Sequence, residues 1–181
     1  MSTTQIVLVR HGQTEWNRIR RVQGHTDVPL NDQGRLQART LAMELDGEQV
    51  DAVYSSDLGR ARETAEILAA TRGGNVVALP ALREKNFGTW EGLTDTEVRE
   101  RFPDAEGTGW GDGESTSEMA ERTVAAVEEI AAAHPGGLVV VVTHGGPMRA
   151  LLRYVDGDAS PVDNCGVVRL EARNGRLRKV D

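Results

Sequence analysis

Short apolar runs, each the length of one β-strand, alternate along this chain with segments of helical spacing. Residues 6–9 (Ile-Val-Leu-Val) and 138–142 (Leu-Val-Val-Val-Val) are rich in β-branched side chains. Such runs are typical of strands buried on both faces, as in a parallel sheet. The alternation therefore predicts an α/β fold, a three-layer α/β/α sandwich with a mainly parallel sheet.

Local signals place the other elements. Asn31 or Asp32 is expected to cap the first long helix, and a capping box at residues 115–118 starts another. Asn174-Gly175 predicts a hairpin between the last two strands. The further strands are expected at 52–54, 76–79, 167–170 and 177–180, and the helices at 32–46, 61–69, 96–101, 119–131 and 147–152.

Length and composition limit the kind of protein. The 181 residues contain no repeat or linker, so we expect a single domain over residues 1–181. A net charge of −7 argues against a nucleic-acid partner. The single cysteine, Cys165, excludes an intramolecular disulfide, and no signal peptide or membrane-length apolar run is found. We predict a cytoplasmic protein with no membrane partner and leave its oligomeric state open.

Two of the predicted strands end in the same way. Arg10-His11-Gly12 follows residues 6–9, and Thr143-His144-Gly145 follows residues 138–142. Ligands of open α/β sheets bind beyond the carboxyl ends of the strands. Each imidazole is therefore expected at the ligand-binding edge, where a glycine such as Gly145 lets the backbone approach a ligand closely.

A third strand brings a second arginine to the same edge. Residues 52–55 lead into a helix that begins near Arg60, where an anion would also meet free N–H groups. Two histidines and two arginines suit a tetrahedral dianion, because guanidinium groups bind phosphate oxygens as a fork. No metal site is expected, since His25 and Asp27 form the only compact pair of ligand types.

Ordered motif blocks extend these observations over nearly the whole chain. They are LVRHGQTEWN at 8–17, QGHTD at 23–27, SSDLGRARETA at 55–65, LREKNFGTWEG at 82–92, GES at 113–115 and VTHGG at 142–146. Together they resemble the histidine phosphatase superfamily, branch 1, whose members have the phosphoglycerate mutase-like fold. An isolated Arg-His-Gly would be weak support, whereas several blocks in family order are strong.

The resemblance implies that His11 is the nucleophile and forms a phosphohistidine intermediate. Such an intermediate splits one difficult displacement into two easier ones. The imidazole attacks only when neutral, and nearby Arg10 and Arg60 disfavour its protonated form. The resemblance also implies that these arginines and His144 bind the phosphoryl oxygens and offset the charge of the transition state.

Other site residues follow from the same resemblance. Glu84 matches the family's general acid, which protonates the leaving alkoxide and, once ionised, activates water. Asn17 matches a residue that contacts the phosphoryl group. Gln23 and Gly24 match a segment near the substrate, and Thr14 is expected to contribute a hydroxyl.

Members of the family differ in what accepts the phosphoryl group. Classical mutases carry an insertion, with extra Lys and Arg, before the second histidine. Residues 95–114 contain only Arg99 and Arg101 as cations and are otherwise strongly acidic. We therefore predict a phosphatase, with a cofactor-dependent phosphoglycerate mutase and an inactive module that binds phosphorylated ligands as the alternatives.

The predicted phosphatase needs no metal and no cofactor, and its partner is a small phosphomonoester. The acidic, Gly-rich segment 104–114 is expected to be an exposed loop that borders the pocket. Its charge favours a substrate whose remainder is neutral or cationic over one that is highly anionic.

Overall fold

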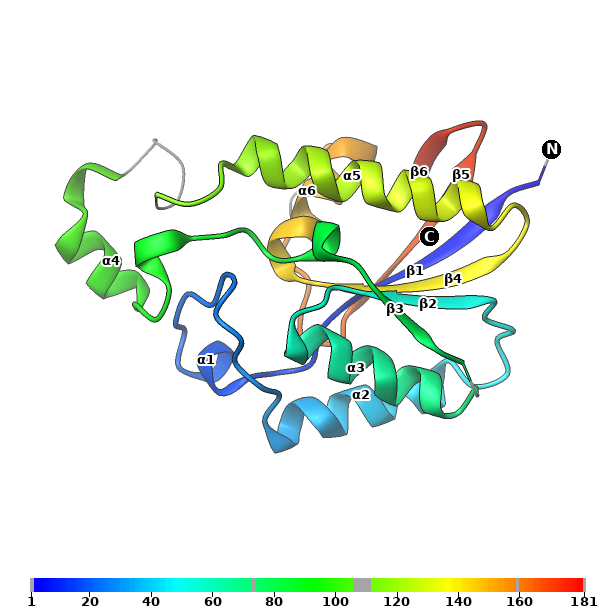
Figure 1. The fold of residues 1–181 in the computed structure, drawn as a ribbon, viewed down its shortest axis with the longest axis horizontal. Helices are drawn as coiled ribbons and strands as arrows, with labels where there is room; N and C mark the ends of the chain where they lie inside the picture. The colour runs from blue at the N-terminus through cyan, green and yellow to red at the C-terminus, as the bar shows by residue number, and fades with distance from the viewer. Residues whose placement is uncertain (1, 73, 106–111, 159, 181) are drawn as a thin grey trace.

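A six-stranded sheet in the order β3-β2-β4-β1-β5-β6 forms the centre of the computed structural model (Figure 1), which describes residues 2–72, 74–105, 112–158 and 160–180. The first four strands in that order are parallel to one another. β5 runs antiparallel to β1, and β6 runs antiparallel to β5. The strands are β1 (Thr4–Arg10), β2 (Ala52–Ser55), β3 (Val76–Ala78), β4 (Leu138–Thr143), β5 (Val167–Arg173) and β6 (Arg176–Val180).

Helices cover both faces of the sheet (Figure 1), so the predicted three-layer α/β/α sandwich is confirmed. The helices α2 (Asp32–Glu44) and α3 (Gly59–Ala70) pack on one face, and α5 (Thr116–Ala133) and α6 (Gly145–Asp156) on the other. The connections contain α1 (Glu15–Arg18), α4 (Asp95–Arg101) and the 3₁₀ turns η1 (Pro80–Leu82), η2 (Gly88–Trp90) and η3 (Pro103–Ala105).

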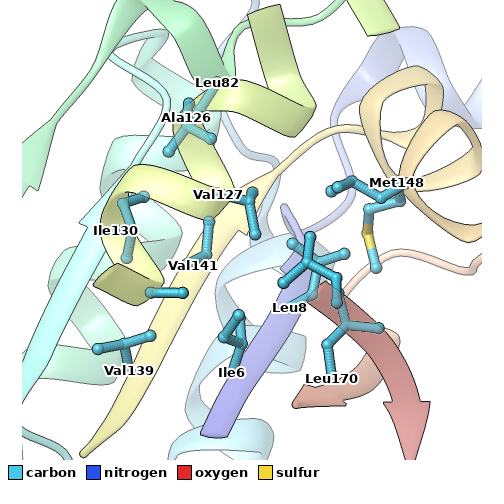
Figure 2. Packing of buried hydrophobic residues seen from close by; sticks show 13 residues of the cluster. Ile6, Leu8, Leu82, Ala126, Val127, Ile130, Val139, Val141, Met148 and Leu170 are labelled. Atoms are coloured by element: carbon cyan, nitrogen blue, oxygen red, sulfur yellow. The ribbon is translucent and has the colours of Figure 1, made fainter. Parts of the chain in front are cut away.

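The apolar run of β1 is buried because its side chains alternate between the two helical layers. Ile6 and Leu8 pack beneath α5 and α6, near Met148 (Figure 2), while Val7 and Val9 pack against α2 and α3. The neighbouring strand β4 alternates in the same way, and its register pairs Leu8 with Val141. These two central strands form the rigid base of the structure.

The chain leaves these neighbouring strands toward opposite faces of the sheet. After β1 it continues to α2 on one face, whereas after β4 it enters α6 on the other. Such a switch point opens a crevice at the carboxyl ends of the strands. His11 and His144 directly follow the two strands and therefore lie at this crevice.

Most local predictions match the structure. Asn31 caps α2, the capping box at Ser115 is formed, and Asn174 and Gly175 form the hairpin turn. The third predicted strand is shorter than expected: β3 stops at Ala78, at the edge of the sheet. The expected loop at 104–114 begins inside η3, and its residues 106–111 lie outside the described part of the chain.

The segment after β1 packs backbone to backbone against the start of α2. A Cβ atom added at Gly12 would lie 2.5 Å from the carbonyl oxygen of Gly34, and one added at Gly34 would overlap the Gln13 carbonyl. The Gly12 N–H also donates to the Thr64 hydroxyl at 3.0 Å. Both positions therefore require glycine, because the close contact between the two segments fixes the position of Gly12, the residue after His11.

We expect Gly34→Ala to lower the free energy of unfolding by about 1–3 kcal/mol, because the new methyl group forces the two segments apart. In an unhindered helix interior the same change would be stabilising by roughly 1 kcal/mol. Gly74→Ala is the matched control, since a Cβ there meets open space. Urea unfolding measures both variants, and a Gly34→Ala protein as stable as wild type would contradict the close contact.

Candidate active site

The two strand-end histidines lie side by side. Their ring centroids are 5.0 Å apart with an angle of 59° between the planes. His11 is 2% exposed and His144 is fully buried. The structure thus brings together two residues that are 133 positions apart in the chain, as the shared strand-end pattern predicts.

A hydrogen bond fixes the tautomer of His11. Its Nδ1 lies 2.7 Å from the carbonyl oxygen of Gly12. A carbonyl can only accept, so Nδ1 carries the proton and Nε2 keeps its lone pair. The pKa of His11 lies well below its ordinary value of 6.5, because the ring is buried and Arg60 and Arg10 are close. His11 is therefore neutral, with a free lone pair on Nε2.

The two arginines reach the same site from different elements. Arg60, in the first turn of α3, is fully buried and donates to the carbonyl oxygens of Gly24 at 2.7 Å and Thr26 at 2.9 Å. Arg10, at the end of β1, donates to the Val162 carbonyl at 2.7 Å. Burial lowers the pKa of both guanidinium groups, yet arginine remains charged at physiological pH.

Several buried nitrogen atoms at this site lack a protein partner. In the described part of the chain they are Nε of Arg10, Nε of Arg60 and both ring nitrogens of His144, besides Nε of the distant Arg72. Burial and the nearby Arg60 hold the pKa of His144 well below 6.5. Leaving buried donors and charges uncompensated is costly, so the arrangement is suited to an oxyanion that accepts from these groups.

Glu84 lies against the start of α6. Its Oε2 accepts from the Gly146 N–H at 3.1 Å and its Oε1 from the Lys85 N–H at 2.8 Å. A Cβ atom at residue 146 would overlap Oε1, so only glycine lets the carboxylate lie this close to the helix. The start of α6 thus positions both residues: His144 is its N-cap, and Glu84 accepts from the Gly146 N–H in its first turn.

Arg122 of α5 binds backbone carbonyl groups of the segment that ends at Glu84. Its guanidinium donates to the carbonyl oxygens of Ala81, Arg83 and Glu84 at 2.8–2.9 Å. It also forms an ion pair with Glu114. The sequence analysis missed this residue, because nothing near it in the chain indicates contacts with carbonyls about 40 positions away.

Thr14, Asn17 and Gln23 form a hydrogen-bonded group beside the histidines. Thr14 and Asn17 make a capping box around α1, and the buried Thr14 hydroxyl donates to Gln23 Oε1 at 2.8 Å. A substrate contact from this hydroxyl stays a prediction. Gly24 reaches the site through its carbonyl bond to Arg60, and a Cβ atom at Gly145 would lie 3.5 Å from the Arg10 guanidinium.

The segment before β5 adds a second contribution that the sequence analysis missed. Asn164 Nδ2 donates to the His11 carbonyl at 3.0 Å and to Asn17 Oδ1 at 3.2 Å. Val162 in the same segment accepts from Arg10. The segment therefore orients three site residues from a distant part of the chain, which no local motif signals.

The expectation of free N–H groups beside Arg60 is wrong for Gly59, the first residue of α3. The Asp27 carboxylate accepts from the Gly59 N–H at 2.8 Å and so occupies this helix end. An anion at this edge would therefore meet the Arg60 side chain rather than the Gly59 N–H. Among the described residues, no group of three or more potential metal ligands is found.

Two described acids of segment 104–114 are bound to their own surroundings, whereas Asp104 is exposed. Asp112 accepts from the Thr89 N–H at 2.8 Å, and Glu114 is paired with Arg122. Both therefore stabilise the turns next to Glu84, and the charge of Glu114 is offset by Arg122. Within the ranges that the structure describes, no helix is long and apolar enough to cross a membrane.

Comparison with known proteins agrees with this geometry. The sequence profile of the histidine phosphatase superfamily, branch 1, matches residues 6–181. The chain belongs to this superfamily. The resemblance seen in the motif blocks is thereby confirmed.

Named relatives of this chain include both mutase-like proteins and phosphatases. Phosphoglycerate mutase-like protein 4 of Arabidopsis thaliana is 42% identical over 88% of this chain and 74% of its own length. A metal-independent phosphoserine phosphatase of the same plant is 42% identical over 82% of this chain and 67% of its own. The structure of a mycobacterial glucosyl-3-phosphoglycerate phosphatase matches with a TM-score of 0.87 at 31% identity, over 98% of this chain and 97% of that one.

We expect this protein to lose stability as the pH falls below about 6.5 in buffer free of phosphate and sulfate. The folded state keeps His11 and His144 neutral, whereas both are protonated in the unfolded chain below their ordinary pKa. The unfolded state then binds more protons. Each histidine thus lowers the free energy of unfolding by up to about 1.4 kcal/mol per pH unit until its folded pKa is reached.

Urea unfolding of wild type and His144→Gln between pH 7.5 and 5 measures this effect. Carboxylates titrate in the same range, so the readout is the difference between the two proteins. His144→Gln should depend less steeply on pH, by about one proton. Equal slopes would show that His144 is not held neutral by the fold.

Proposed function

We propose that the chain is a metal-independent phosphomonoester hydrolase that acts through a phosphohistidine on His11, with Glu84 as general acid and base. The carrying observation is the set of unpartnered nitrogen atoms on Arg10, Arg60 and His144, gathered beside the neutral His11. Three donor groups beside one nucleophile match the needs of phosphoryl transfer, which depends mainly on positioning and electrostatics.

In the first step, Nε2 of His11 attacks phosphorus and the bond from phosphorus to the ester oxygen breaks. Arg10, Arg60 and His144 donate to the phosphoryl oxygens as charge moves onto them. Glu84, protonated at this stage, gives its proton to the leaving oxygen, so that an alcohol departs rather than an alkoxide. The Gly12 carbonyl bound to Nδ1 stabilises the positive charge that the substituted imidazole acquires.

In the second step, water attacks the phosphohistidine. Glu84, now ionised, takes a proton from that water, the bond from nitrogen to phosphorus breaks, and inorganic phosphate leaves. His11 returns to its neutral state. The cycle consumes one water and needs no group beyond the side chains of this chain.

The relatives support the phosphatase assignment without deciding it. The names of the phosphoserine and glucosyl-3-phosphoglycerate phosphatases describe hydrolysis of phosphomonoesters. A phosphoglycerate mutase is the second candidate, because other relatives carry mutase names. An inactive binding module is the third.

In our proposal residues 1–181 act as one histidine phosphatase domain in the cytoplasm. The domain uses no cofactor, and its partner is a small phosphomonoester. The substrate site is completed by Asn17, Gln23, Gly24, Thr14 and Gly145.

We expect His11→Ala to lower phosphate release from phosphomonoesters by at least about a thousandfold, because the covalent route is lost. The acid-labile phosphoenzyme should disappear with it, as measured by rapid acid quench of protein mixed with labelled substrate. His134→Ala is the control, since this histidine contacts Tyr54 away from the site. A phosphoenzyme that persists in His11→Ala would refute the nucleophile assignment.

The same assay, run with EDTA over a panel of monoesters that includes 3-phosphoglycerate, separates the candidate functions. Release of phosphate that survives EDTA supports the metal-independent phosphatase. Conversion of 3- to 2-phosphoglycerate without release would identify a mutase. Neither reaction, with retained binding of phosphorylated ligands, would favour the binding module.

We expect Glu84→Gln to slow hydrolysis of alkyl phosphates by about 10²–10⁴-fold and that of p-nitrophenyl phosphate by less than about tenfold. The glutamine keeps an acceptor for the Gly146 N–H but cannot donate a proton to the leaving oxygen. p-Nitrophenolate departs without one. Steady-state kinetics on both esters measures the ratio, and equal losses would mean that Glu84 has only a structural role.

A further inference from the structure

A cavity of about 500 Å³ adjoins the active site on the side of Glu84. Its wall includes Glu84, Lys85, Phe87, Gly146, Arg149 and Arg153, and we call it the leaving-group cavity. Glu84 and Gly146 belong both to this wall and to the active site. An alcohol that receives its proton from Glu84 therefore lies at the mouth of the cavity, and the rest of the leaving group extends into it.

Lys85 contributes a buried positive charge to this wall. Its residue is 3% exposed, and its Nζ bonds the Thr116 hydroxyl at 3.3 Å and lies 5.5 Å from the Phe87 ring centre. Among the described residues it forms no ion pair within 4 Å. Buried ammonium groups are ordinarily paired, so Lys85 has capacity for an anionic partner.

Arg149 and Arg153 add two further charges from one face of α6. They are four positions apart, so their side chains are neighbours, and like charges at this spacing are mildly destabilising. Arg153 lies in the last turn, where a cation interacts favourably with the helix dipole, but Arg149 lies in the middle of the helix. Arg149 is also close enough to Arg10 to lower its pKa.

Neither arginine has an ion-pair partner in the described part of the chain. Some exposed arginines of this acidic protein are paired, such as Arg62 with Glu66 and Arg178 with Glu171, whereas others, such as Arg39, have no ion pair among the described residues. The cavity wall thus carries three cations against the single carboxylate of Glu84, which already accepts from two backbone N–H groups. Its excess positive charge is local, in a chain whose net charge is −7.

We infer that the leaving group of the natural substrate carries a second anionic group, a carboxylate or another phosphoryl group, which binds to Lys85, Arg149 and Arg153. This inference rests on the proposed hydrolase function and names its substrate class. It reverses the expectation of a neutral or cationic remainder. That expectation relied on the four acids of segment 104–114, of which Asp112 is bound to Thr89 and Glu114 to Arg122, while neither of these nor the exposed Asp104 lines the leaving-group cavity.

A matched pair of substrates tests the inference. 3-Phosphoglycerate and glycerol 3-phosphate differ only in a carboxylate that replaces a CH₂OH group. We expect wild type to hydrolyse 3-phosphoglycerate with a kcat/KM at least about tenfold higher, because guanidinium groups bind carboxylates by charge-assisted hydrogen bonds. Raised salt should reduce the difference, since both arginines are exposed.

The double variant Arg149→Gln/Arg153→Gln should lose most of this preference while its kcat/KM for glycerol 3-phosphate stays within about threefold of wild type. Arg62→Gln is the control for loss of an exposed positive charge, because it removes one such charge from α3, on the other face of the sheet. A preference that survives in the double variant, or that is equally lost in Arg62→Gln, would overturn the assignment of these residues.

A binding measurement separates this inference from the proposed function. Calorimetry with His11→Ala compares the affinities for the same two compounds without turnover. If wild type releases no phosphate from either compound but His11→Ala binds 3-phosphoglycerate about tenfold more tightly, the anion site stands and the hydrolase assignment fails. If both compounds are hydrolysed and bound equally, the hydrolase stands and the anion site is refuted.

Discussion

The structure depends on two positively charged guanidinium groups, those of Arg10 and Arg60, which lie close to each other inside the protein. Arg10 and Arg60 each lower the pKa of His11, and each keeps an unpartnered Nε. The fold offsets part of this cost with backbone carbonyls of Gly24, Thr26 and Val162, contributed by loops distant in the chain. The remainder is left for an oxyanion. A site of this kind is stable only on a rigid base, which the central strands β1 and β4 provide.

The fold and the centre of the site were predictable because their signals are local. A run such as 138–142 has no stable position except a strand covered on both faces. A histidine that directly follows such a strand must lie at its carboxyl end, so two of them lie at one edge whenever their strands are parallel. The positions of His11, His144 and Arg60 thus followed from the strand and helix pattern, and family motifs added Glu84.

The supporting contacts were not predictable, because they join residues with no common local pattern. Arg122 resembles any arginine on an amphipathic helix, yet it binds three carbonyls around Glu84. Asp27 caps α3 from 32 positions away, a contact that its neighbours in the chain do not indicate. A count of charges along the chain likewise does not show which acids are already paired, as Glu114 is with Arg122. The spacing of Arg149 and Arg153 indicates a shared helix face, but only the structure places that face beside Glu84.

The helix α6 carries two kinds of function in successive turns. Its start provides His144 and the Gly146 N–H that binds Glu84, where a single added methyl group would not fit. Its later turns provide Arg149 and Arg153, which are exposed and unconstrained by packing. If these arginines bind the second anion as we infer, exchanging side chains in the later turns changes which metabolite is accepted, while the first turn remains fixed by its close contact with Glu84. One backbone segment separates what must be inherited unchanged from what can diverge.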